Sequence, residues 1–194
     1  MLAMNSKRLA GICGLLTPII TLTLIFISIK LSPWFSWHDN ALSDMGVSKT
    51  FNLFNPALLI GGALHFVFVI FGLRSTIGPG RLPRVGFGAV LLGAIALPLI
   101  GIITEDYGRT HYYVAATYFI ATPLGYILLG SAWVKRHDRV LGWLSIAAGA
   151  AAIFAITLVP HKRIAVPEIL AATLMGVWTF AMSVKLLVDN ASHE

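Results

Sequence analysis

The chain has 194 residues, of which 57% are hydrophobic and 11% charged, whereas an average soluble domain carries about 25% charged residues. Its formal net charge of +6 comes from basic residues that lie between apolar runs, so they indicate contacts with the headgroups of membrane lipids and no nucleic-acid partner. These numbers exclude a cytosolic enzyme with a tail anchor and predict that residues 1–194 form a single integral membrane domain.

Six apolar runs follow one another along the chain, and each is long enough to cross a bilayer as a helix. Glycine and alanine are dense within them, as in Gly61-Gly62-Ala63, which lets helix backbones approach closely in lipid. Pro18, Pro98 and Pro123 fall inside runs, where we expect kinks. The sequence therefore predicts an all-α membrane protein, a six-transmembrane-helix bundle. Its spans are expected at roughly 9–31, 54–73, 84–104, 112–134, 140–160 and 165–187.

Successive connections between the spans lie on alternating sides of the membrane, and the basic residues are unevenly divided between these two sides. Nine of the 14 Lys and Arg residues fall on the side of the termini, and five fall on the other side. Because Lys and Arg are enriched in cytoplasmic loops, we predict a multi-pass protein of the cell membrane with both termini in the cytoplasm. The outer side then holds five of the eight acidic residues, namely Asp39, Asp44, Glu105, Asp106 and Glu168.

The connection over residues 32–55 is the longest in the chain and contains helix signals. Ser36-Trp37-His38-Asp39 has the spacing of a capping box with Asp in place of Glu, and Gly46 favours a helix stop. We therefore predict a short interfacial helix between the first and second spans. Asn55-Pro56 has the pattern of an N-cap followed by proline at the first helical position, and we expect it to open the second span.

On this predicted interfacial helix, Asn40 and Asp44 are four residues apart and share a face, with Ser43 beside them. An interfacial cap with aromatic anchors at Trp34 and Trp37 accounts for the same segment without any catalysis. The sequence leaves both interpretations open, a polar site or a purely structural cap.

Several stretches of the chain resemble a known family. The most specific is Asn40-Ala41-Leu42-Ser43-Asp44-Met45-Gly46, and further matches are Phe54-Asn55 and residues 111–116 and 166–169. On these residues, the chain resembles over essentially its whole length the small bacterial and archaeal membrane proteins grouped as domain of unknown function 998. The resemblance implies a topology and carries no established activity.

A more distant resemblance rests on Leu42-Ser43-Asp44-Met45-Gly46 alone. This stretch is similar to the Ile-Ser-Asp-Thr-Gly element that follows the first helix in the DRAM and Sfk group of eukaryotic six-helix proteins. That group is linked to lipid handling, but the proline-rich acidic continuation typical of it is missing here. The resemblance implies no more than a connection with lipids.

Three titratable residues stand at the outer ends of different predicted helices, and we take them as candidate catalytic residues. They are Asp44 on the interfacial helix, His111 at the start of the fourth span and Glu168 at the start of the sixth. Carboxylates and imidazole suffice for general acid and base chemistry, or for holding a divalent metal such as zinc. A carboxylate in a first helical turn is, however, also stabilised by the helix dipole without any further role.

Glu105 and Asp106 close the third span, where a helix C-terminus disfavours acids unless a cation lies nearby. Two adjacent acids can also raise one pKa towards neutrality. His65 lies deep inside the second span, where we expect it to bond a neighbouring helix, and we leave it out of the site. The candidate binding residues are Asn40, Ser43, Asp106, Arg109 and His161.

Two functional hypotheses follow for a polar pocket at the outer face. In the first, the protein is a lipid-modifying hydrolase or transferase with His111 as general base. Glu168 or Asp44 would orient His111 or bind a metal, and Asn40 or Ser43 would donate hydrogen bonds to an oxyanion. In the second, the protein binds a lipid or small solute without catalysis, as a transporter, a lipid sensor or an accessory subunit of a membrane complex. The expected partners are membrane lipids, with a homo-oligomer or a larger membrane complex as alternatives. The sequence holds no known nucleophile or metal motif, which favours the second hypothesis.

Overall fold

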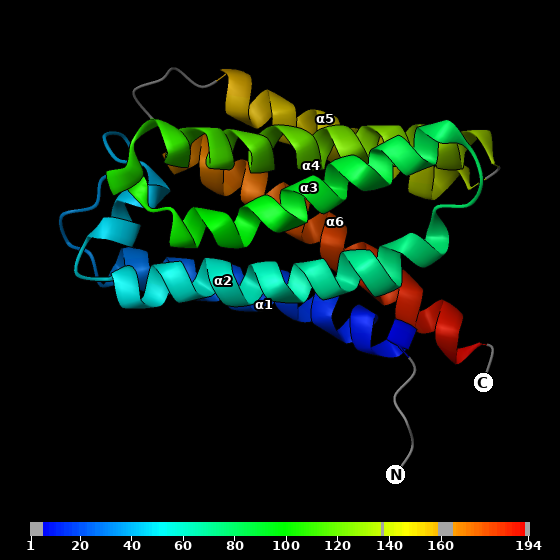
Figure 1. The fold of residues 1–194 in the computed structure, drawn as a ribbon, viewed down its shortest axis with the longest axis horizontal. Coiled ribbons are helices and arrows are strands. Elements are labelled where there is room, and N and C mark those ends of the chain that lie inside the picture. The colour runs from blue at the N-terminus through cyan, green and yellow to red at the C-terminus, as the bar shows by residue number, and fades with distance from the viewer. Residues whose placement is uncertain (1–5, 137, 159–164, 193–194) are drawn as a thin grey trace, which may run out of the picture.

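The computed structural model describes residues 6–136, 138–158 and 165–192, and within these ranges all regular structure is helical. Six helices are long and apolar enough to cross a membrane (Figure 1), which confirms the predicted six-span bundle. The protein is a multi-pass membrane protein. The six helices are α1 Ser6–Lys30, α2 Phe51–Val67, α3 Arg81–Ile102, α4 Arg109–Lys135, α5 Arg139–Leu158 and α6 Ala165–Ala191.

Four shorter elements complete the bundle. A π-helical segment, η2 (Phe68–Gly72), and a 3-10 segment, η3 (Leu73–Thr76), continue α2 without a break, so the second span runs from Phe51 to Thr76. The 3-10 helix η1 (Leu42–Val47) precedes α2, and the 3-10 turn η4 (Glu105–Tyr107) joins α3 to α4.

Most helices extend a few residues beyond the predicted spans. Arg81, Arg109 and Arg139 each stand at the start of a helix, and Lys135 stands at the end of α4. Long basic side chains in end turns reach the membrane surface while their alkyl stems stay in the apolar region, so the helices continue past the purely apolar runs. The predicted end of the fifth span, residues 159–160, lies outside the described residues.

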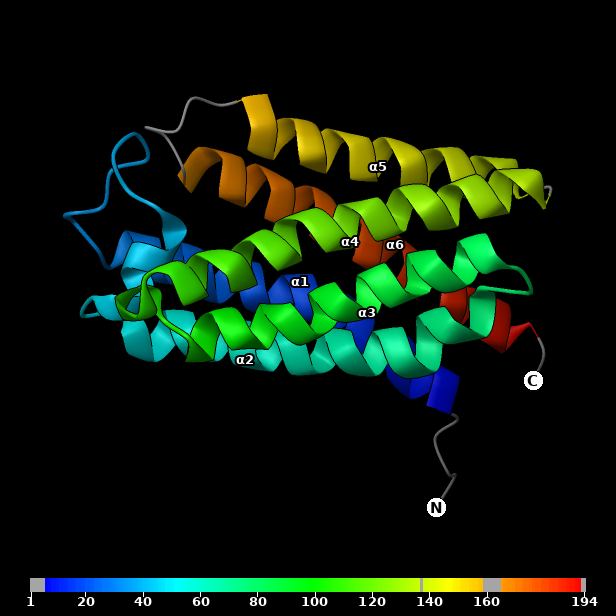
Figure 2. The same cartoon turned by 45° about the horizontal axis from the view of Figure 1, so that its top comes forward.

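Helices that are neighbours in the chain pack side by side, and the last helix, α6, packs on the first, α1. The six helices therefore form a closed ring, in which α4, α5 and α6 run side by side (Figure 2). The start of α1 and the end of α6 lie at the same end of the bundle (Figure 1). We call this the terminal end, and we call the opposite end, which carries η1 and η4, the η1 end.

Glycines allow the backbones of α4 and α5 to meet, as the dense Gly and Ala pattern predicts. A Cβ atom added to Gly130 would lie 2.5 Å from the carbonyl oxygen of Gly142, and one added to Gly142 would lie 2.7 Å from that of Gly130. Any side chain at either position would push the two backbones apart. The contact between α3 and α4 has the same character, since a Cβ atom on Gly125 would lie 2.8 Å from the Gly86 oxygen.

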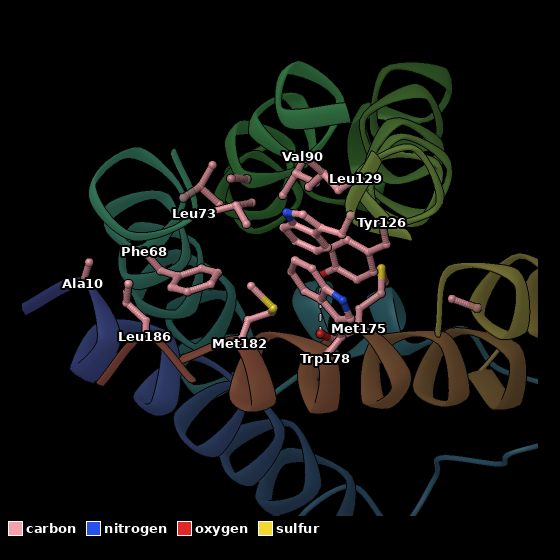
Figure 3. Close-up of a cluster of buried hydrophobic side chains, with 14 of the residues drawn as sticks. Ala10, Phe68, Leu73, Val90, Tyr126, Leu129, Met175, Trp178, Met182 and Leu186 are labelled. Atoms are coloured by element: carbon pink, nitrogen blue, oxygen red, sulfur yellow. Dashed lines mark hydrogen bonds between the residues drawn. The ribbon is translucent and has the colours of Figure 1, made fainter. Parts of the chain in front are cut away.

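Stacked aromatic rings fill the core of the bundle towards the terminal end (Figure 3). Tyr126 of α4 stacks on Trp178 of α6 with 3.7 Å between ring centroids, and Trp133 lies on the same stack at 6.5 Å from Trp178. The indole N–H of Trp178 donates a 2.8 Å hydrogen bond to Ser145 Oγ of α5. The stack therefore ties three helices together.

The structure corrects two sequence predictions at the η1 end. The interfacial helix begins at Leu42 and is a 3-10 helix. Ser36 Oγ donates a 2.7 Å hydrogen bond to Asp39 Oδ2, but this pair closes only a turn, because the chain is extended at Ala41. The prediction that Asn55 caps α2 is also wrong, since α2 begins at Phe51. Instead, Asn55 Nδ2 donates a 3.0 Å hydrogen bond to the Gly46 carbonyl oxygen, which fastens η1 to α2.

Candidate functional site

The first turn of α6 holds the segment that leads into η1. Glu168 Oε2 accepts a 2.8 Å hydrogen bond from the backbone N–H of Leu42. The backbone N–H of Ala165 donates a 3.0 Å hydrogen bond to the carbonyl oxygen of Asn40. A carboxylate is also favourable at a helix N-terminus. Glu168 thus has a structural role in docking η1, whatever else it does.

The side chain of Asn40 is engaged at both of its polar atoms. Its Nδ2 donates a 2.6 Å hydrogen bond to Asp44 Oδ2, and its Oδ1 accepts a 2.9 Å bond from the backbone N–H of Ser36. Asp44 Oδ2 also accepts a 3.2 Å bond from the backbone N–H of Ala41. Asn40 and Asp44 therefore meet and both stabilise the start of η1. They do not share a helix face as predicted, because Asn40 precedes η1 and the chain is extended at Ala41.

Three carboxyl groups gather around η1. The pKa of Glu105 is raised from 4.5 to about 7, first by burial, then by a side-chain hydrogen bond with Asp44 and by the negative charges of Asp44 and Asp106. Glu168 is the third group, since it interacts electrostatically with Asp44 and Glu105. Burial and the neighbouring negative charges therefore both favour the protonated form of Glu105.

The imidazole of His111 is oriented by the end of the preceding helix. Its Nδ1 lies 2.6 Å from the carbonyl oxygen of Ile103, the residue that follows α3. A carbonyl oxygen only accepts hydrogen bonds, so the proton of the neutral imidazole is on Nδ1. The Nε2 lone pair is then available as a base or a hydrogen-bond acceptor.

A groove of about 420 Å³ runs along α4 between η1, η4, the start of α6 and α5. We call it the lateral groove. Its volume falls in the range of small-molecule sites, about 300–1,000 Å³. At the η1 end it is lined by the polar residues Ser43, Glu105, His111 and Glu168. Farther along α4 and α5 it is lined by Ala115, Ala116, Phe119, Ile120 and Ile156.

A second, deeper hollow of about 80 Å³ lies inside the ring of helices and is bounded by η1 and by every long helix except α5. We call it the central cavity. Ser43, His111 and Glu168 line both the lateral groove and the central cavity. The structure thus brings these three candidate residues together where the two hollows meet, while Asp44 lies beside them, against Glu105.

Two further candidate residues, Asp106 and Arg109, are not among the described residues that line the two hollows. Asp106 and Arg109 are exposed, and Arg109 forms no ion pair with any described residue. His161 lies outside the described residues. Over the part of the chain that the structure covers, no group of three or more His, Cys, Asp or Glu side chains could hold a metal ion. Among the described candidates, Asn40, Asp44, His111 and Glu168 each form a side-chain hydrogen bond.

Sequence reasoning left two residues out of the site. Glu105 lines the lateral groove, and the signal for it was the pair of acids at the end of a helix. His65 lines the central cavity and is 3% exposed, and its ring forms no hydrogen bond with a described residue. A lone histidine in an apolar run was the only signal for it, and that signal does not tell which way the ring points.

The comparisons with known proteins supply a family and no activity. A family model described as "Protein of unknown function (DUF998)" matches residues 15–185. No curated protein and no solved structure matches the chain.

Proposed function

The chain belongs to the DUF998 family of unknown function, and we propose that it binds the polar end of a membrane amphiphile where the lateral groove meets the central cavity. The observation that supports the proposal is the change in polarity along the groove. Carboxyl, hydroxyl and imidazole groups line its η1 end, and apolar side chains line the rest. A lipid placed with its headgroup at the membrane surface and its chain in the hydrocarbon has the same gradient.

The dimensions and the position of the groove suit such a ligand. From His111 to Ile120 the groove follows ten residues of α4, about 14 Å at the usual helical rise. Tyr112 is 67% exposed and Ile120 is 54% exposed, so the rim of the groove faces the lipid side of the bundle. An amphiphile would enter from the bilayer without crossing water.

The lining favours a particular headgroup chemistry. Glu105 and Glu168 offer oxygen acceptors, Ser43 offers a hydroxyl, and the described lining contains no Lys or Arg. We therefore expect an amine or a hydroxyl-rich headgroup to bind better than a bare anionic one. On the basic-residue count of the sequence, the η1 end faces outwards, so the ligand would come from the outer leaflet.

The proposal is tested by lipid retention. Protein exchanged into nanodiscs of equal phosphatidylethanolamine and phosphatidylglycerol content is examined by native mass spectrometry. We expect phosphatidylethanolamine to be retained preferentially, and we expect Ala116→Phe, which fills the groove, to reduce its retention roughly tenfold. Ala147→Phe is the matched control, because Ala147 is exposed on α5 and does not line the groove. Equal retention by both variants, or no preference between the lipids, would refute the proposal.

One observation favours a second candidate function, a lipid-modifying hydrolase or transferase. The hydrogen bond from His111 Nδ1 to the Ile103 oxygen leaves Nε2 free to act as a general base. Ser43, which lines the same junction, has no hydrogen bond from its hydroxyl to any described residue. In this reaction Nε2 would accept the proton of the Ser43 hydroxyl or of a water molecule while that oxygen attacks an ester carbonyl of the lipid. The ester C–O bond would then break, and His111 would return the proton to the leaving alcohol oxygen. A His111 variant that separates the two functions is described below.

A further inference from the structure

The central cavity reaches deep into the membrane region of the bundle. It extends from Ser43, His111 and Glu168 at its mouth to Tyr126 and His65. His65 stands fourteen residues after the start of α2, which corresponds to about 21 Å along the helix. The bottom of the cavity therefore lies well inside the hydrocarbon layer, whose thickness is about 30 Å.

A buried polar side chain without a partner lines this cavity. His65 is only 3% exposed, and its Nδ1 has no hydrogen-bond partner among the described residues. Its ring lies 5.9 Å from that of Phe68, measured between centroids. An unpaired polar atom in an apolar interior is unfavourable unless a molecule in the cavity supplies the partner. Phe68 also begins the π-helical segment η2, and such segments are frequent at functional sites.

The lining of the cavity limits what this molecule can be. Among the described lining residues the only carboxylate is Glu168, at the mouth, and none is Lys or Arg. A charged molecule would find no opposite charge near His65. The volume of about 80 Å³ has room for a few water molecules, since each occupies about 30 Å³ in the liquid. The cavity suits water or another small uncharged molecule that forms hydrogen bonds.

A larger hollow opens at the terminal end of the bundle. It has a volume of about 630 Å³ and is lined by Ser75, Thr76, Trp133, Arg136 and Asp138, among others. We call it the terminal vestibule. Its polar and charged lining indicates that it is filled with water.

Three stacked rings lie between the lining of the terminal vestibule and the lining of the central cavity. Figure 3 shows two of them, Tyr126 and Trp178. Tyr126 lines the cavity, Trp133 lines the vestibule, and Trp178 stacks on both. Tyr126 and Trp133 are seven residues apart on α4, which is about 10 Å. The hydrogen bond from Trp178 Nε1 to Ser145 Oγ holds the middle ring in place. The barrier between the two hollows is therefore about 10 Å thick, and it consists of these rings and the buried side chains clustered with them, Leu129 and Met182 among them.

We propose that the central cavity, the aromatic stack and the terminal vestibule form a path through the membrane for water-sized, uncharged molecules that form hydrogen bonds. His65 is the binding group at the middle of this path, and the rings of Tyr126, Trp178 and Trp133 are its closed gate. Hydrophobic and aromatic constrictions close pores by excluding water. Displacing Trp178 connects the cavity with the vestibule.

The test uses the full chain in vesicles of phosphatidylethanolamine and phosphatidylglycerol, with water as the probe. Stopped-flow light scattering measures vesicle shrinkage after an osmotic step. We expect the wild type to be near the background of protein-free vesicles, because the gate is closed, and Trp178→Ala to be roughly tenfold more permeable to water. Trp143→Ala is the matched control, since Trp143 is 60% exposed on α5 and lies away from the path; it should stay at the wild-type value.

A second variant tests whether the water passes His65. Adding His65→Phe to Trp178→Ala should return the permeability to background, because the phenyl ring offers no hydrogen bond and fills the cavity. If Trp178→Ala does not fold, as judged by thermal melting, Tyr126→Ala opens the gate from the cavity side. A folded gate variant with background permeability would overturn the proposal. So would an increase that survives His65→Phe, or an equal increase in Trp143→Ala.

Discussion

Glu168 Oε2 accepts a 2.8 Å hydrogen bond from the backbone N–H of Leu42, 126 residues earlier in the chain. This contact joins the first turn of α6 to the first residue of η1. Because Glu168 also lines the lateral groove and the central cavity, the same carboxylate holds the wall of the site and faces its interior. Loss of this hydrogen bond would therefore disturb both the docking of η1 and the lining of the site.

Removal of the Glu168 carboxylate should therefore loosen η1. Glu168→Ala leaves the Leu42 N–H without its acceptor, and we expect a loss of about 1–3 kcal/mol in unfolding free energy. Glu168→Gln keeps an acceptor oxygen and should retain most of the stability. Thermal melting in detergent, with limited proteolysis of residues 32–50, measures both effects. Asp39→Ala, which affects only the exposed bond with Ser36, is the control, and an equal melting temperature in all four proteins would contradict the role of Glu168.

Glu105 should make the stability of the protein depend on pH. Its pKa is raised from 4.5 to about 7, first by burial and then by Asp44 and Asp106. The folded protein keeps this proton at pH values where the unfolded chain has lost it. Between these two pKa values stability therefore falls as the pH rises, and above the higher one it levels off.

The Glu105→Gln variant isolates this effect, because it cannot ionise. Its melting temperature should change less than that of the wild type between about pH 5 and pH 8, and it should exceed the wild-type value at the upper end. Asp39→Asn serves as the control for removal of an exposed acid. If wild type and Glu105→Gln give parallel melting curves over this range, Glu105 does not carry a raised pKa.

The spans and the connections differ in how far the sequence predicts them. Hydropathy alone locates the six spans, since a run of about 20 apolar residues has few alternatives to a membrane helix. The capping pattern does not predict that α2 begins at Phe51, because Asn55 lies inside the helix and its side chain bonds the oxygen of Gly46 in η1. Capping rules consider only neighbouring residues, so they fail where the side chain forms its hydrogen bond with another element of the fold.

From the sequence, only those residues of the site that stand at helix ends can be predicted. Ser43, His111 and Glu168 are recognisable as polar groups at one side of the membrane, and the structure places them together. His65 is not recognisable in this way, because its helix is apolar on every side and the sequence does not distinguish the face towards lipid from the face towards the ring. The η2 π-helix beside it has no sequence signature.

The packing of α4 on α5 should depend on the absence of a side chain at Gly130. In Gly130→Ala the new Cβ atom would lie 2.5 Å from the backbone oxygen of Gly142. Because the Cβ is fixed to the backbone of α4 and the oxygen belongs to the backbone of α5, neither can turn away, and the strain should cost about 1–3 kcal/mol. Gly88→Ala is the matched control, since no atom lies within 4 Å of its added Cβ. Melting temperatures in detergent should fall for Gly130→Ala and stay or rise for Gly88→Ala. A similar fall in both would mean that helix contact is not the cause.

The orientation of the bundle is testable with the single native cysteine removed. Lys49 precedes α2 at the η1 end, Arg81 opens α3 at the terminal end, and both are exposed. In a Cys13→Ser background, a membrane-impermeant maleimide should label Lys49→Cys on intact cells and Arg81→Cys only after permeabilisation. This follows from the excess of Lys and Arg on the side of the termini. The reverse labelling pattern would place the η1 end, and the site with it, in the cytoplasm.

His111→Asn separates the two candidate functions. The Asn side chain carries an N–H near the position of Nδ1 and can still donate to the Ile103 oxygen, but it has no counterpart of Nε2. The variant should therefore stay folded and keep its bound amphiphile, whereas any hydrolase or transferase activity should fall by about 10²–10⁴-fold, the usual contribution of a general base. Mass spectrometry of nanodisc lipids before and after incubation measures turnover. His38→Asn, at an exposed position, is the control. Turnover that persists in His111→Asn would exclude His111 as the base, and lipids left unchanged by the wild type would leave binding as the function of the site.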